Sequence, residues 1–152
     1  MKAEILEKIR AELRGRLDRL AKAALEAHAA ATDPGSKAES KYDTRTLEAS
    51  YLASGQAKQV EELAESVRIF DGLSLPDYGM EDGIDAGALV EVEQGEGTRY
   101  FLLAPVAGGL EIVHEGLEIT LLTPESPLYR KLSGLRAGDS LDDPPLMVLE
   151  VL

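Results

Sequence analysis

The chain of 152 residues has no cysteine, no tryptophan and only two histidines. Without cysteine it can form neither a disulfide framework nor a thiolate metal site, and it has no thiol nucleophile. Two histidines exclude a metal site built from several imidazoles. No stretch approaches the roughly 20 consecutive apolar residues needed to span a bilayer. The function must therefore rest on oxygen and nitrogen groups, and we expect a cytoplasmic protein without membrane partners.

Positive charge is also scarce, with 16 basic against 28 acidic side chains and a net charge of −12. This balance disfavours a protein that holds DNA by neutralising phosphates, so a protein partner is expected and specific DNA binding is not. The charge is uneven, because residues 72–152 carry 4 basic and 15 acidic side chains. The shift in charge predicts two domains with a boundary between Asp71 and Asp82.

The first part of the chain has the apolar spacing of helices. From Met1 to Ala31, apolar residues recur every three or four positions, which predicts one long helix. Pro34 and Gly35 then break the pattern and predict a turn. A second periodic stretch runs from about Asp43 to Phe70. Since neither helix could bury its apolar stripe alone, residues 1–75 are predicted to form an antiparallel helical hairpin, or coiled coil.

Residues 80–152 have the pattern of a small α+β domain. Short segments rich in β-branched and apolar residues predict five strands, at 88–92, 99–104, 110–113, 117–122 and 146–151. Between the fourth and fifth, Ser126 offers a helix N-cap and Pro127 suits the first helical position. The predicted fold class is thus α+β, with a helical hairpin followed by a small mixed domain.

One segment of this second domain carries a family resemblance. The stretch from Ile119 to Leu128, continued through Leu132, Gly134 and Gly138, resembles the C-terminal signature of the Gre-type transcription elongation factors. The hairpin, with its Ala-Glu pair at 38–39, is similar to their N-terminal domain. The resemblance implies that the hairpin enters the secondary channel of bacterial RNA polymerase. It also implies that residues 80–152 form an FKBP-like domain that docks at the channel entrance.

The resemblance gives the hairpin turn a role in chemistry. Gre factors carry turn acids that help to hold Mg²⁺ in the polymerase active centre and promote cleavage of backtracked RNA near its 3′ end. Asp33 falls at the first such acid and Glu39 at the acid of the Ala-Glu pair, while Asp43 is a further candidate. Mg²⁺ prefers oxygen ligands, so Asp33 is the expected metal ligand, with the ion shared with polymerase. The chain itself is then no enzyme.

The turn departs from the family pattern at Ser36, where an acid is expected three residues after Asp33. Two functions therefore stay open: stimulation of cleavage, or regulation from within the channel without cleavage. Each acid also has a purely structural explanation. Asp33 before a proline is common in turns, and Glu39 and Asp43 could favour the start of the second helix through its dipole.

Four further residues are candidates for polymerase contact. Tyr42 and Arg45 flank a dense group of cations and capping residues at the start of the second helix, which either touches polymerase or only caps the helix. Ser126 and Pro127 match the family's docking loop, although a Ser-Pro pair is also a good helix start without any partner.

Two alternatives belong to other classes. An FKBP-like domain could be a peptidyl-prolyl isomerase, but residues 72–152 contain only four aromatic residues, Tyr78, Tyr100, Phe101 and Tyr129, to line a pocket. A coiled-coil scaffold would need an apolar stripe left exposed for a partner helix. The expectation is a monomer bound to RNA polymerase.

Overall fold

The computed structural model describes residues 1–32 and 44–152, and the side chains of residues 1–26 and 55–152. The chain divides into two compact units. Met1–Ile9 and Gly72–Leu152 form the first, which we call the sheet unit, and Arg10–Asp71 form the second, the helical unit. The described helices include none that combines the length and apolarity needed to cross a membrane.

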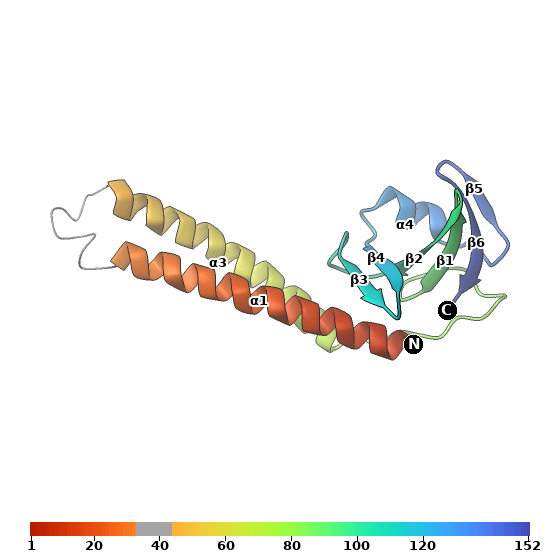
Figure 1. Cartoon of the computed structure of the whole chain (residues 1–152), viewed down its shortest axis with the longest axis horizontal. Coiled ribbons are helices and arrows are strands. Elements are labelled where there is room, and N and C mark those ends of the chain that lie inside the picture. Colours follow the sequence, from red (N-terminus) through yellow and green to blue (C-terminus); the bar gives the residue numbers. More distant parts are fainter. Residues whose placement is uncertain (33–43) are drawn as a thin grey trace. The chain divides into compact units, whose positions relative to one another are not determined.

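The helical unit is built from two long helices, as its periodicity predicted. Helix α1 spans Lys2–Thr32 and helix α3 spans Thr44–Asp71. They run in opposite directions (Figure 1). The absence of proline from both helices and the recurrence of apolar residues every three or four positions favour this form. Leu13 and Phe70 are buried, as expected for members of the two apolar stripes.

Arginines of α1 hold the end of α3. The guanidinium of Arg10 donates to the backbone oxygen of Phe70 at 2.8 Å and to that of Asp71 at 3.3 Å. Arg14 pairs with the Asp71 carboxylate. The last carbonyls of a helix have no partner within it and lie at the negative end of its dipole, so cations are well placed there. These two arginines thus secure the hairpin at the end opposite its turn.

The sheet unit contains one sheet of six strands in the order β3-β4-β2-β1-β6-β5. All neighbours are antiparallel except β2 and β4, which are parallel. The strands and the short helix have these bounds: β1 Leu89–Gln94, β2 Gly97–Leu103, β3 Glu111–His114, β4 Leu117–Leu122, α4 Pro127–Leu132, β5 Ser140–Asp142 and β6 Pro145–Val151. The helical hairpin and the α+β domain confirm the predicted fold class.

Helix α4 covers one face of the sheet (Figure 1). Leu132, which is 0% exposed, joins Val90, Phe101, Leu103 and Val148 in one hydrophobic cluster. Residues that alternate with these along the strands, such as Leu102 and Leu121, are buried as well. The second face of β2 and β4 is therefore also covered at these positions.

The first turns of α1 belong to the sheet unit. The predicted ranges, 1–75 and 80–152, place these residues with the hairpin, whereas the structure groups Met1–Ile9 with Gly72–Leu152. Ile5 and Ile9 are 0% exposed. The Lys2 ammonium donates to the backbone oxygen of Leu152 at 2.9 Å, and the Lys8 ammonium to that of Val113 at 3.2 Å. Burial and these two hydrogen bonds hold the first turns of α1 against the domain.

Candidate functional site

Two candidate residues whose side chains the structure describes, Ser126 and Pro127, stand where the loop after β4 meets α4. The Ser126 amide donates to the backbone oxygen of Thr123 at 2.8 Å, which closes a tight turn after β4. Ser126 has an extended backbone at the N-cap position, and Pro127 is the first residue of α4. The predicted helix start is therefore observed, because proline is favoured where a helix needs no amide donor.

The Ser126 hydroxyl does not perform the usual task of an N-cap side chain. It makes no capping hydrogen bond to an amide of the first turn of α4. The residue is half-buried, and its neighbours Pro124, Glu125 and Pro127 are exposed. The side-chain oxygen of a serine in this position normally accepts a hydrogen bond from a backbone amide of the first helical turn. The loop thus exposes two prolines beside a serine hydroxyl that makes no capping hydrogen bond.

A shallow apolar hollow adjoins this loop. Its volume is about 230 Å³, and it is formed within the sheet unit by Leu73, Ser74, Leu75, Pro76, Ala86, Gly87, Pro105, Pro124 and Tyr129. Sites for small molecules usually have about 300–1,000 Å³. The hollow is thus better matched to one or two apolar side chains of a protein partner. We call the Ser126-Pro127 loop and this hollow the docking face.

Charged groups of both signs lie at the docking face: the Asp85 carboxylate near Tyr129, and the Arg130 guanidinium, which donates to the backbone oxygen of Glu125 at 3.2 Å. Burial raises the pKa of the Tyr129 hydroxyl, and the nearby Asp85 carboxylate raises it further. The Tyr78 hydroxyl, whose pKa is also raised by burial and by Asp85, donates to the backbone oxygen of Ala86 at 2.7 Å. Both tyrosines therefore stay neutral at physiological pH, and the carboxylate near Tyr129 is that of Asp85. A lysine or arginine of a partner would complement this carboxylate.

The aromatic residues of the sheet unit do not gather in one pocket. Tyr129 lines the docking hollow, Tyr100 a second hollow with Glu91, and Tyr78 a third beside Lys2. Phe101 is 5% exposed and lies in the core. Each of these three hollows therefore has a single aromatic wall.

The other predicted site residues are not placed by the structure. Asp33, Glu39, Tyr42 and Asp43 lie outside the described residues, and Arg45 lies in α3 with its side chain outside them. Their roles as turn acids, Mg²⁺ ligand and polymerase contacts stay predictions. Ser126 and Pro127 are described, and their contact with polymerase likewise stays a prediction.

One cluster in the sheet unit, formed by Glu4, His114 and Glu115, is not indicated by any pattern in the sequence. His114 reads in the sequence as a lone histidine at a strand end. Only the packing of the first turns of α1 against the domain brings Glu4 to it. The one local signal is the Glu115-Gly116 pair after a short strand, which predicts a tight hairpin turn and nothing about a ligand.

Comparison with known proteins gives distant similarities. No family model matches the chain, and no curated protein matches it. Among solved structures, the chain is similar to GreA factor homolog 1 (Gfh1) of Thermus thermophilus, with 18% identity, a TM-score of 0.37 and 94% of each chain covered. It is also similar to Gfh1 of Thermus aquaticus, with 22% identity, a TM-score of 0.35, and 98% of this chain and 92% of the other covered. At these values neither similarity assigns a function to the chain.

Proposed function

We propose that the protein is a Gre-type accessory factor that binds bacterial RNA polymerase. The support comes from the order of its parts and from one motif. A helical hairpin precedes an α+β domain, and the Ser126-Pro127 pair of the family-like segment follows β4 and opens α4. The observation that carries the proposal is the uncapped hydroxyl of Ser126 on an exposed loop.

The docking face has the chemistry of a protein-binding surface. Exposed proline rings and an apolar hollow supply area that a partner can cover, and the Ser126 hydroxyl supplies a hydrogen bond that fixes orientation. The Asp85 carboxylate near Tyr129 favours a basic group on the partner. In this proposal the sheet unit binds at the entrance of the polymerase secondary channel.

The hairpin turn then supplies carboxylates to the active centre of polymerase. Asp33 is the proposed ligand for a Mg²⁺ ion shared with polymerase, and Glu39 and Asp43 lie near it in the sequence. Carboxylate oxygens are the donors that Mg²⁺ prefers. When bound, the ion stabilises the attacking and leaving oxygens during hydrolysis of backtracked RNA. The chain contributes ligands and performs no hydrolysis alone.

A second form of the proposal follows from Ser36. This residue occupies the position of an expected second acid and cannot supply a carboxylate. In this form the factor occupies the channel and regulates polymerase without stimulating cleavage. The two forms share the docking face and differ only in the effect of the turn on RNA hydrolysis.

Docking is tested by Ser126→Ala. Since the hydroxyl caps no amide of α4, its removal should leave the stability of the domain nearly unchanged. Loss of one hydrogen bond to polymerase should weaken binding by about 0.5–1.5 kcal/mol, or roughly two- to tenfold in Kd. Fluorescence anisotropy with labelled protein and purified polymerase measures this change.

The matched control is Ser133→Ala, at the other end of the same helix. The Ser133 hydroxyl donates to the backbone oxygen of Tyr129 at 2.8 Å, so this variant loses a bond within the domain. We expect slightly lower stability and an unchanged Kd for polymerase. Equal Kd values for wild type and Ser126→Ala would remove Ser126 from the proposed interface.

A further inference from the structure

His114 is a buried polar residue whose ring nitrogens make no hydrogen bond among the described residues. It ends strand β3, whose residues alternate between exposed and buried, and only 4% of its side chain is exposed. Among the described residues, neither Nδ1 nor Nε2 has a hydrogen-bond partner. Buried polar groups in folded proteins are nearly always paired, so an imidazole left in this way calls for an explanation.

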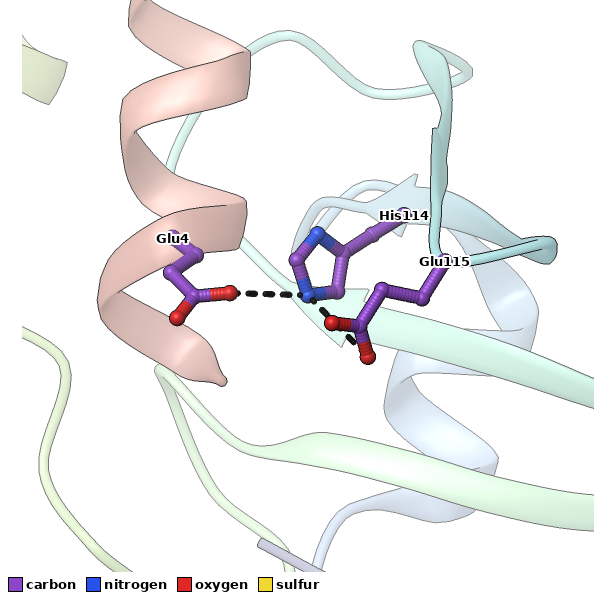
Figure 2. Close-up of side chains that lie close together, drawn as sticks. All are labelled: Glu4, His114 and Glu115. Carbon is purple, nitrogen blue, oxygen red and sulfur yellow. Dashed lines mark ion pairs between the residues drawn. The ribbon is translucent and has the colours of Figure 1, made fainter.

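Two carboxylates converge on the same ring nitrogen. The Oε2 atom of Glu4 lies 3.2 Å from His114 Nε2, and the Oε2 atom of Glu115 lies 3.9 Å from it. Figure 2 shows Glu4 reaching the imidazole from helix α1 and Glu115 reaching it from the turn after β3. The shorter contact lacks the geometry of a hydrogen bond. One Nε2–H could in any case serve only one of the two anions.

The fold holds these three residues from separate segments of the sheet unit. Glu4 precedes the buried Ile5 on α1, and Lys8 one turn later donates to the backbone oxygen of Val113, next to His114. Glu115 and Gly116 have φ of 51° and 81° and connect β3 to β4. Positive φ at both central positions is the pattern of a type I′ hairpin turn, where asparagine, aspartate or glycine is preferred to glutamate.

The spacing of the donors suits a divalent transition metal. In a tetrahedral zinc site with bonds of about 2.0–2.1 Å, neighbouring ligand atoms lie about 3.3–3.4 Å apart. The two distances from Nε2, 3.2 and 3.9 Å, lie on either side of that value. Potential ligand atoms of all three residues lie within 4.8 Å of one another. Because the Glu4 and Glu115 side chains are 65% and 76% exposed, small rotations can bring their oxygens to one ion.

We propose that Glu4, His114 and Glu115 form a binding site for a divalent transition metal, with Zn²⁺ as the preferred ion. One imidazole and two carboxylates give three protein ligands and leave a position for water. The imidazole selects against Mg²⁺ and Ca²⁺, which prefer oxygen ligands. The ion neutralises two adjacent carboxylates and gives the buried Nε2 its missing partner. It also joins the first turn of α1 to the β3–β4 turn.

The test is a titration of the intact, chelator-treated protein with Zn²⁺, followed by calorimetry and by thermal unfolding. We expect binding of one Zn²⁺ per chain and a rise in Tm of about 5 °C at saturation, since a ligand of the native state stabilises it. Mg²⁺ should produce neither effect. With Co²⁺ in place of Zn²⁺, visible absorption bands of a four-coordinate ion should appear.

Two variants remove ligands in different ways. His114→Gln should weaken Zn²⁺ binding by at least about tenfold. Mutating a residue that only hydrogen-bonds to a metal ligand already has an effect of that size. Glu115→Asn should weaken binding while preserving the fold, because asparagine favours the turn's backbone. Matched controls are His28→Gln, at the other histidine of the chain, and Glu111→Gln, an exposed acid on β3.

The proposal stands if the controls bind Zn²⁺ like wild type and both ligand variants bind it more weakly. It fails if wild type shows no saturable Zn²⁺ binding, or if Glu115→Asn, correctly folded, binds as tightly as wild type. Should His114→Gln not fold, the Glu115→Asn result decides. None of these outcomes depends on polymerase, so the metal site and the proposed function are tested separately.

Discussion

Replacing Leu132 with alanine is expected to lower the free energy of unfolding of the sheet unit by about 2–5 kcal/mol. Leu132 is the fully buried residue of α4 and lies in the hydrophobic cluster with Val90, Phe101 and Val148. The substitution removes apolar contacts and leaves a cavity beneath the helix. The whole free energy of unfolding of a native protein is about 5–15 kcal/mol, so this loss is a large part of it. Urea denaturation followed by circular dichroism measures it.

The control is Leu149→Ala on β6, where the leucine is 38% exposed. The same change there should cost well under about 1 kcal/mol, since little packing is lost. Because α4 begins at the Ser126-Pro127 loop, Leu132→Ala should also weaken polymerase binding. A loss of stability no larger than that of Leu149→Ala would show that α4 does not pack on the sheet as described.

Replacing Asp33 with alanine is expected to reduce stimulated cleavage of backtracked RNA by on the order of 10², the usual loss when one electrostatic stabiliser is removed from a reaction site. The physical reason is the loss of the carboxylate proposed to hold the shared Mg²⁺. The measurement is transcript cleavage by stalled polymerase complexes at a saturating concentration of the factor. Glu39→Ala should have a smaller effect, because Asp33 is the proposed ligand.

Asp18→Ala serves as the control, since Asp18 is an exposed acid of α1 far in sequence from the turn. This variant should stimulate cleavage by polymerase as strongly as wild type. If wild-type protein binds polymerase and never raises cleavage above the intrinsic rate, the form without cleavage, suggested by Ser36, is the correct one. If Asp33→Ala and Asp18→Ala both retain full stimulation, Asp33 is not the metal ligand.

Much of the fold could be predicted because its local signals are strong. Strand β4 was predicted with the bounds that it has, and Pro127 marks the first residue of α4. Strand β5 was missed, since Ser140–Asp142 contains one apolar residue among three and has no periodicity to detect. The parallel pairing of β2 with β4 was also beyond prediction, because strand patterns fix which side chains are buried and not which strands are neighbours.

The candidate sites differ in how far the sequence could reveal them. Ser126 was visible as a helix start, but the absence of its capping hydrogen bond depends on side-chain geometry. The cluster of Glu4, His114 and Glu115 was invisible. The burial of Ile5 reflects the packing of the first turns of α1 within the sheet unit. Helical periodicity cannot show that the first turns of a helix pack in one unit and its remaining turns in another.

In the proposed complex, the sheet unit docks on RNA polymerase while the hairpin turn reaches its active centre. Site-specific photocrosslinking from a reactive amino acid at Ser36, in backtracked complexes, tests both parts at once. The account predicts crosslinks to the catalytic subunit beside the active-site metal or to the RNA 3′ end, and their loss when Ser126 and Tyr129 are both replaced by alanine. Crosslinks confined to the outer surface of polymerase, or none from correctly folded protein, would contradict it.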